Sequence, residues 1–267
     1  MTDDWAPRGI DTETPSVARM YDYYLGGKDH FSSDRAAADK VIAALPDVPA
    51  LAQANRAFLQ RTVHYLASEC GIDQFIDMGA GLPTAGNVHQ VAQEINPRAR
   101  VVYVDNDPIV LAHARALMEQ ESERVIVEEA DLREPHQVLS NPRVRNLIDF
   151  SRPVAVLFVA TLHFVSDDED PAGIVSTFRD AMAPGSYLVL SHVARGTADR
   201  TTADTTADAA YGRATANIVF RDEDQVRKLF EGFQLTAPGL IDVAEWHPDG
   251  ESVPTRLAGI AGVAQLR

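Results

Sequence analysis

The sequence predicts an α/β fold: a doubly wound, mostly parallel, Rossmann-like sheet with an antiparallel last strand and an N-terminal helical cap. From residue 71 onward, short apolar runs alternate with helical patterns, as they do in βαβ units. Val154–Val159 is almost continuously apolar, which is typical of a strand covered on both faces. The apolar run Phe75–Met78 leads directly into the turn Gly79-Ala80-Gly81, a feature of the first strand in such sheets.

The elements before the sheet are predicted to be an irregular arm, residues 1–15, followed by helices. Ser16 is a suitable N-cap, and Gly26-Gly27 ends the helix that Ser16 begins. Ser32 or Ser33 is expected to cap the next helix. The predicted helices are Val17–Leu25, Asp34–Leu45 and Ala50–Glu69.

Residues 71–267 are expected to form the sheet domain, and residues 1–70 the arm and cap over it. The predicted strands are Gln74–Met78, Val101–Val104, Val125–Glu129, Val154–Val159, Ser186–Ser191, Leu240–Trp246 and Gly259–Gln265. The predicted helices are Asn87–Ile95, Pro108–Met118, Pro171–Met182 and Glu223–Phe230, with a polar helix or loop at Pro135–Leu147. Arg195–Thr215 has little apolar periodicity and is expected to be an inserted loop or short helix at the functional edge.

Composition limits the partners. The 267 residues are 45% hydrophobic, enough for a full core. With 24 basic and 39 acidic residues the net charge is −15, which disfavours nucleic acid or an anionic membrane as partner. Cys70 is the only cysteine, and no histidine–carboxylate spacing indicates a metal site. Without a signal segment, or a run approaching the roughly 18 apolar residues of a spanning helix, we expect a soluble, cytoplasmic protein.

The glycine turn can bring the backbone close to a ligand, because Gly79 and Gly81 carry no Cβ. A dinucleotide fingerprint needs Gly or Ala three residues after the second glycine, where this chain has Thr84, preceded by Pro83. A pyrophosphate therefore lacks its usual helix N-terminus, which favours a cofactor without phosphates, S-adenosylmethionine (SAM), over NAD. The alternative is an ordinary strand-to-helix turn.

Carboxylates follow the next two strands. Asp105 lies 24 positions after Gly81, near the spacing of about 20 expected of a ribose-binding acid. Its alternative role is a helix cap, although Asp107 can be the cap while Asp105 binds ribose. Asp131 suits the adenine amino group, or else caps a helix before Pro135.

The residues Ala160-Thr161-Leu162-His163-Phe164 follow a predicted inner strand and are expected beside the reacting centre. His163 is the candidate general base, since its pKa suits neutral pH. The alternative is a packed histidine that is hydrogen-bonded to the backbone.

Aromatic and basic residues of the N-terminal helices are further candidates. Tyr21, Tyr23 and Tyr24 can face a sulfonium through a cation–π contact, or simply pack a helix hairpin onto the sheet. Asn55 and Arg56 are candidates to bind the methionine carboxylate of SAM.

Four segments carry a resemblance to a known family: Ala18–Asp29, Asn55–Leu59, Phe75–Thr84 and Tyr103–Pro108. Together they resemble a bacterial, mainly actinobacterial, S-adenosyl methyltransferase family long known as a domain of unknown function. The resemblance implies a class I methyltransferase sheet, a SAM site with S-adenosylhomocysteine (SAH) as product, and a helical cap whose tyrosine block lines the pocket mouth. It places Gly79 and Gly81 at the methionine moiety, Asp105 at the ribose and Asp131 at the adenine. Asp29 departs from the family, in which asparagine is common there.

The sequence thus predicts a SAM-dependent methyltransferase that acts on a small molecule. The alternatives are a SAM-binding regulatory protein without catalysis and an NAD-dependent dehydrogenase. The expected cofactor-binding residues are Met78, Gly79, Ala80, Gly81, Asp105, Asn106, Asp131, Leu132, Ala160, Thr161, Tyr21, Tyr24, Gly26 and Arg56.

Overall fold

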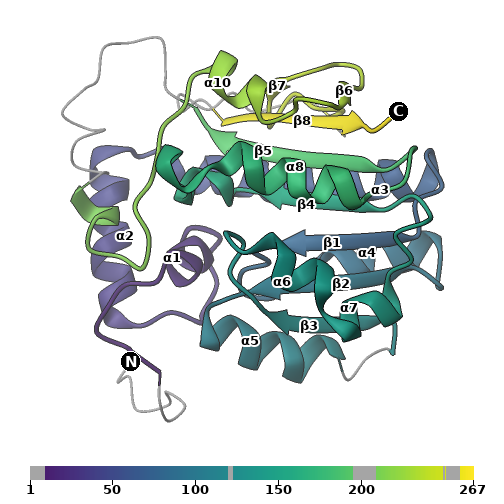
Figure 1. Cartoon of the computed structure of the whole chain (residues 1–267). Helices are drawn as coiled ribbons and strands as arrows, with labels where there is room; N and C mark the ends of the chain where they lie inside the picture. The colour runs from purple at the N-terminus through teal and green to yellow at the C-terminus, as the bar shows by residue number, and fades with distance from the viewer. Residues whose placement is uncertain (1–9, 120–122, 195–208, 249, 251–258) are drawn as a thin grey trace.

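The strands meet in one central sheet, shown in Figure 1 for the computed structural model of the chain. The structure describes residues 10–119, 123–194, 209–248, 250 and 259–267. The strands are β1 (Gln74–Met78), β2 (Arg100–Asp105), β3 (Val125–Glu129), β4 (Ala155–Val159), β5 (Tyr187–Val193), β6 (Gln234–Leu235), β7 (Ile241–Asp242) and β8 (Gly259–Gln265). Their order is β3-β2-β1-β4-β5-β8-β6, with β7 also paired to β8. β1 to β5 run parallel and β8 runs antiparallel to β5, which confirms the predicted doubly wound fold.

Helices cover both faces of this sheet. The helices α3 (Val48–Ser68), α4 (Val88–Ile95) and α5 (Pro108–Ala114) pack on one face. The other face carries α6 (Pro135–Ser140), α7 (Pro142–Leu147), α8 (Pro171–Ala181) and α10 (Glu223–Lys228). In Figure 1, α6, α7 and α8 lie in front of the sheet, and α3 and α4 lie behind it. Because successive side chains of a strand point to opposite faces, Phe75 and Ile76 of β1 enter different core clusters.

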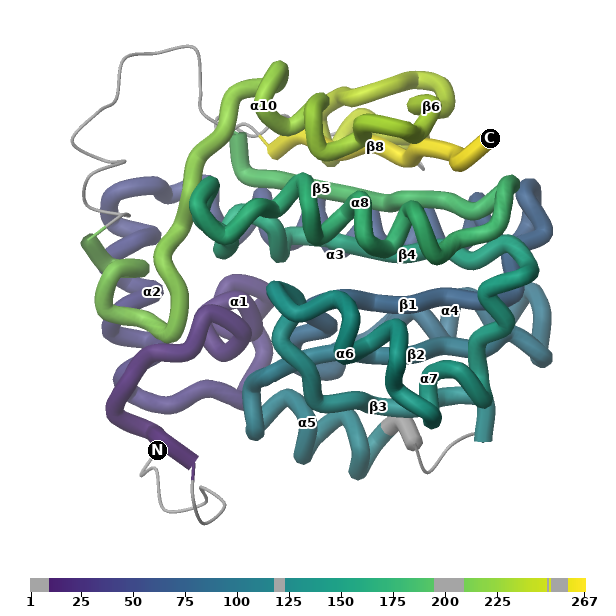
Figure 2. The backbone as a smooth tube through the Cα atoms, viewed as in Figure 1, coloured from purple at the N-terminus to yellow at the C-terminus, as the bar shows by residue number. Residues whose placement is uncertain are grey.

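Two short helices, α1 (Val17–Tyr24) and α2 (Ser32–Ala44), extend the molecule beyond the sheet. They pack together with Ala210 and Tyr211 in a separate apolar cluster. Figure 2 shows the segment from residue 209 running past α2 and α1 before it reaches α10. The expected loop Arg195–Thr215 falls partly outside the described residues, and its described part begins with the helical residues 209–211.

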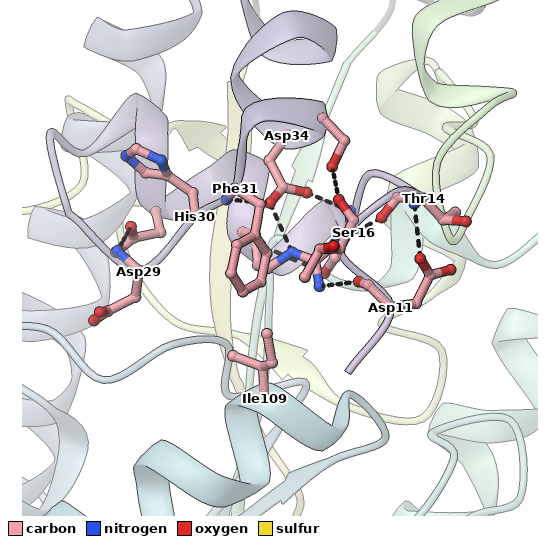
Figure 3. A network of polar contacts seen from close by, with 12 residues as sticks. Asp11, Thr14, Ser16, Asp29, His30, Phe31, Asp34 and Ile109 are labelled. Carbon is pink, nitrogen blue, oxygen red and sulfur yellow. Dashed lines mark hydrogen bonds and ion pairs between the residues drawn. The ribbon is translucent and has the colours of Figure 1, made fainter. Parts of the chain in front are cut away.

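A buried ion pair holds the N-terminal elements together (Figure 3). The side chains of Arg19 and Asp34 are only 4% and 0% exposed, and Nε of Arg19 lies 2.7 Å from Oδ2 of Asp34. The Asp34 carboxylate also accepts from the backbone N–H groups of Ser16 at 2.8 Å and Phe31 at 2.7 Å. The remaining guanidinium nitrogens of Arg19 donate to the carbonyls of Asp11 and Thr14. A buried charge is tolerated only when it is paired and hydrogen-bonded, and this pair meets that condition.

Asp34 also explains why the predicted cap of α2 was wrong. The helix begins at Ser32, so neither Ser32 nor Ser33 is the N-cap, and Phe31 takes that position. Phe31 has no polar side chain to accept from the first turn. Asp34, in that first turn, accepts from the Phe31 N–H instead.

Ser16 and Asp107 join the cap to the sheet domain. Ser16 is the N-cap of α1, as predicted, and its Oγ donates to Oδ2 of Asp107 at 2.5 Å. The other Asp107 oxygen accepts from the Ile109 N–H at 2.9 Å, so Asp107 is also the predicted N-cap of α5. One carboxylate therefore anchors two helices that lie 91 residues apart in sequence.

The predicted strand Leu240–Trp246 is mostly wrong, since only Ile241–Asp242 pairs with β8. Trp246 is fully buried and makes edge-to-face contacts with Phe58 and Tyr65. The Arg61 guanidinium donates hydrogen bonds to the carbonyls of Trp246 and Val243 at 2.8 Å each. These two backbone carbonyls therefore have partners without strand pairing.

The polar stretch Pro135–Leu147 forms two helices rather than one. Asn141 caps α7 by accepting from the Arg143 N–H, and Pro142 takes the first helical position, where its missing N–H is tolerated. Among the described residues, no helix combines the length and apolar character needed to cross a membrane.

Replacing Arg19 by Met is expected to lower the free energy of unfolding by about 3 kcal/mol, because the Asp34 carboxylate would remain buried without its countercharge. Arg227→Met is the matched control, since Arg227 pairs with Glu223 on the surface, where both side chains are about half exposed. Urea unfolding followed by circular dichroism measures both variants. Equal, small effects would show that the buried pair does not hold the cap.

Candidate active site

A cavity of about 740 Å³ lies between the carboxyl ends of the parallel strands and the N-terminal helices. It sits where the strand order reverses between β1 and β4, the position at which doubly wound sheets bind ligands. Most of the predicted site residues line it: Tyr21, Tyr24, Arg56, Gly79, Ala80, Gly81, Asp105, Asn106, Asp131, Leu132, Ala160, Thr161 and His163.

Three predicted residues are not among those that line the cavity. The Tyr23 hydroxyl donates to Oδ1 of Asp39 at 2.9 Å in an exposed hydrogen bond. Met78 points to the opposite face of β1 and is buried in the core there. Gly26 has φ +78° and follows the end of α1, away from the cavity-lining residues. Its left-handed conformation ends the helix, as predicted for the glycine pair.

The glycine turn is shaped by a close approach to the residue after β4. A Cβ on Gly79 would lie 2.5 Å from Cγ2 of Thr161, and the φ of Gly79 is +73°. Both space and backbone conformation therefore require glycine at this position. The N–H groups of Gly79 and Ala80 donate to the Val104 carbonyl at 2.8 and 3.1 Å, which fixes the turn against the end of β2.

Asp105 supports the other glycine of the turn. Its Oδ2 accepts from the Gly81 N–H and its Oδ1 from the Asp107 N–H, both at 2.9 Å. Burial raises the pKa of Asp105 to about 6, although these hydrogen bonds act in the opposite direction. Asp105 thus lies on the cavity wall, where backbone N–H groups occupy part of its acceptor capacity.

Asp77 is a cavity residue to which the sequence analysis assigned no role. It lies in β1, is 5% exposed, and faces the cavity two positions before Gly79. Burial raises its pKa to about 7, with Arg56 opposing this and Asp105 adding to it. An acidic residue within an otherwise buried strand was the signal that could have identified it, because such a group is costly unless it has a use.

Asp131 is bound to Arg133 in two parallel hydrogen bonds. Oδ1 accepts from Nε at 2.8 Å and Oδ2 from Nη2 at 2.7 Å, which lowers the pKa of Asp131. The N-cap of α6 is Glu134, so the alternative reading of Asp131 as the cap before Pro135 is wrong. Asp131 and Leu132 lie side by side on the cavity wall.

A hydrogen-bond chain crosses from the cap to the end of β4. The Tyr21 hydroxyl donates to the Ala52 carbonyl at 3.1 Å and accepts from Nδ2 of Asn55 at 2.9 Å. Oδ1 of Asn55 accepts from the Ser191 hydroxyl at 2.5 Å, and Ser191 accepts in turn from the Ala160 N–H at 2.9 Å. This chain of hydrogen bonds therefore links α1, α3, β5 and the residue after β4 around the cavity.

Arg56 directly follows Asn55, a member of this hydrogen-bond chain, and its side chain also lines the cavity. Nη2 donates to Oδ1 of Asn87 at 2.8 Å. Its Nε is buried without a hydrogen-bond partner in the described structure. Arg56 is thus a cation on the cavity wall, and its charge lowers the pKa of the nearby Asp77 carboxyl group.

His163 differs from the usual arrangement of a general base. Within the described residues neither ring nitrogen has a hydrogen-bond partner, and Nδ1 is fully buried. Burial, followed by the nearby His192 and Arg221, lowers its pKa well below the ordinary value. The predicted alternative, a ring bonded to backbone, instead fits His192, whose Nδ1 lies 2.6 Å from the Val193 carbonyl. Among the described residues, no cluster of three or more His, Cys, Asp or Glu side chains is placed to hold a metal ion.

Comparison with known proteins connects this cavity to a family. The profile of the family described as S-adenosyl methyltransferase matches residues 3–267. A crystal structure of a candidate methyltransferase from Thermobifida fusca is 40% identical, with a TM-score of 0.91 over 98% of this chain and 99% of that one. A DUF574 family protein from Streptomyces avermitilis is 37% identical, with a TM-score of 0.91 over 97% of this chain and 100% of that one.

A more distant match shows the fold alone. Human N-acetylserotonin methyltransferase, solved in complex with SAM, is 14% identical, with a TM-score of 0.51 over 92% of this chain and 70% of that one. A search of proteins with curated descriptions found no match. The profile match over nearly the whole chain confirms the resemblance found in the sequence, and the chain belongs to the S-adenosyl methyltransferase family.

Proposed function

We propose that the protein transfers the methyl group of SAM to a small molecule, with cofactor and acceptor side by side in the one cavity. The observation that supports this proposal is that the glycine turn, the Asp105 carboxylate and an apolar wall under the N-terminal helices all line the same cavity. A volume of about 740 Å³ is ample for ligands of this size. The arm, α1 and α2 act as the cap over the cofactor, whereas α3, which was predicted to belong to the cap, packs on the sheet with the SAM-binding domain of residues 71–267.

The cofactor assignments follow from the chemistry of each wall. The methionine moiety lies against Gly79 and Gly81, with Arg56 at its carboxylate and Asp77 at its ammonium group. Asp105 accepts the ribose hydroxyls with the lone pairs that the backbone leaves unused. Asn106, Asp131 and Leu132 surround the adenine, and Ala80, Ala160 and Thr161 complete the wall by their position.

Bound SAM supplies an activated methyl group on a sulfonium. The nucleophilic atom of the acceptor would attack the methyl carbon in line with its bond to sulfur; that bond would break with its electrons passing to sulfur to give SAH, and the proton lost by an O–H or N–H acceptor would pass to solvent. The part played by this chain is positioning, which can supply much of the rate enhancement when the reacting atoms are held in line. The aromatic faces of Tyr21 and Tyr24, both on the cavity wall, suit the positive charge on sulfur.

Asp105→Asn is expected to weaken SAM and SAH binding by about tenfold or more, because it removes a charge-assisted acceptor for the ribose. Isothermal titration calorimetry measures the affinity, and circular dichroism shows whether the variant is still folded after the Asp105 contact to the glycine turn has changed. Asp180→Asn is the matched control, since that carboxylate is 69% exposed and pairs with Arg179 away from the cavity. Unchanged affinity in the Asp105 variant would overturn the ribose assignment.

SAM affinity is expected to rise as the pH increases from about 6 to about 8, because the Asp77 carboxyl, with a pKa of about 7, must lose its proton to bind the ammonium group. Asp77→Asn should remove most of this rise. Asp105, with a pKa of about 6, keeps its carboxyl group in that variant, so a rise in affinity that remains near pH 6 belongs to Asp105. Calorimetric titrations across the range test the claim, and an equal slope in the Asn variant would contradict it.

The same carboxyl should oppose stability in the unliganded protein. Its folded-state pKa lies above the ordinary value of 3.8, so its contribution to stability is present at low pH and is lost as the pH rises through about 7. Asp77→Asn is therefore expected to raise the melting temperature at about pH 8 and to change it little at about pH 4. A lower melting temperature at the higher pH would show that the charged form stabilises the fold.

A further inference from the structure

One part of the cavity is lined by an apolar cluster, which we call the acceptor lobe. It consists of Tyr24, Leu45, Val48, Phe164, Tyr211 and Ile218, which pack together and all line the cavity. These residues come from α1, the end of α2 (the C-cap Leu45), α3, the turn after β4 and the segment that begins at residue 209. The lobe adjoins Thr161 and His163, so it lies on the side of the glycine turn that faces β4.

Charge is distributed unevenly around the cavity. Among the described residues, every charged side chain on its wall lies outside the acceptor lobe: Asp11, Arg19, Arg56, Asp77, Asp105, Asp107, Asp131 and Arg133. Arg221 is near His163, but it is 2% exposed and already donates to Leu162, Val165, Asp167 and His192. A carboxylate or phosphate that entered the lobe would therefore lose its water and find no cation among the described residues.

The polar groups beside the lobe are mostly bonded to one another. The Tyr24 and Tyr211 hydroxyls lie 3.2 Å apart and share a hydrogen bond. Tyr21 and Ser191 are held in the chain through Asn55. His192 lies 2.6 Å from the Val193 carbonyl through Nδ1 and accepts from Arg221 through Nε2. These groups are committed to the protein rather than to a ligand.

Two groups are exceptions. Oγ1 of Thr161 is buried without a hydrogen-bond partner. Nδ1 of His163 is likewise sealed without a partner, so Nε2 is the ring atom left to meet a ligand. An orphaned buried N–H is rarer in proteins than an under-satisfied acceptor, which favours the neutral tautomer with the lone pair on Nδ1 and the proton on Nε2. The lowered pKa agrees with a neutral ring. In this state Nε2–H of His163, a residue that lines the cavity, is a donor available to a ligand.

We propose that the methyl acceptor is an uncharged, largely apolar molecule and that Nε2–H of His163 recognises a hydrogen-bond acceptor on it. This inference rests on the proposed function, since it names the substrate class of the same cavity. It changes the role of His163 from the general base that the sequence suggested to a recognition residue.

The test uses size-matched neutral and anionic probes with the full chain saturated with SAH. The pairs are 2-naphthol with 2-naphthoate, indole-3-ethanol with indole-3-acetate, and 4-phenylphenol with biphenyl-4-carboxylate. Ligand-observed NMR titration gives each affinity without requiring turnover. Neutral members should bind at least about tenfold more tightly than their anionic partners, because the lobe offers the carboxylate no countercharge.

Three variants make the test specific. Ile218→Lys places a cation in the lobe and should shift the preference toward the anionic probes, whereas Leu117→Lys, at an exposed position, should not. Val48→Lys repeats the change from a second element if the first variant fails to fold. His163→Phe should weaken the neutral probes about tenfold, and His163→Gln, which restores an N–H donor, should recover part of the loss. SAH affinity is measured for every variant and should be unchanged in Ile218→Lys, Val48→Lys and Leu117→Lys.

The possible results distinguish a failure of this inference from a failure of the proposed function on which it rests. If the protein fails to bind SAH at all, the proposed function fails and the inference falls with it. If SAH binds, but the anionic probes bind as tightly as the neutral ones or no neutral probe binds, the inference alone is overturned. A preference that His163→Phe and Ile218→Lys leave unchanged in folded, SAH-bound protein would also overturn it.

Discussion

The close approach of Gly79 to Thr161 is the constraint around which the cavity is built. The parallel order places the ends of β1 and β4 side by side, and the missing Cβ lets the two connections come within contact distance. Asp105 then holds Gly81, while the Val104 carbonyl holds Gly79 and Ala80. The turn is thus fixed from both neighbouring strands, which leaves its surface open toward the cap.

The carboxylates in and near the cavity fall into two groups, those paired with an arginine and those without such a partner. Asp34 and Asp131 are paired with arginines and contribute to the framework. Asp77 and Asp105 are buried with raised pKa values and without an ion-pair partner at hydrogen-bond distance in the described structure. Burying a carboxyl group in this way works against stability, and a cationic, hydroxyl-bearing cofactor would offset that cost. This contrast is the physical reason for separating the binding carboxylates from the structural ones.

Local patterns in the sequence predicted the sheet well because each strand is apolar and short. β1, β3 and β8 have the predicted bounds, and Ser16 and Asp107 cap the helices expected of them. The failures arise from long-range contacts. Nothing near Asn55 in sequence indicates its bond to Ser191, which lies 136 positions away. Similarly, Trp246 reads as part of a strand until the packing of α3 against it is known. The site residues on strand ends were predictable from topology, whereas the isolation of His163 depends on tertiary structure. Asp131 pairs with Arg133 only two positions away, a local contact to which the sequence analysis gave no weight.

The central claim is that one cavity holds SAM across the glycine turn with its sulfur toward the acceptor lobe. A crystal structure of the protein grown with SAH tests this most directly. The claim predicts density for the homocysteine portion over Gly79-Ala80-Gly81, the ribose hydroxyls within hydrogen-bond distance of Asp105, and the sulfur facing Tyr24 and His163. An adenine ring lying in the acceptor lobe, or SAH bound outside the cavity, would contradict it.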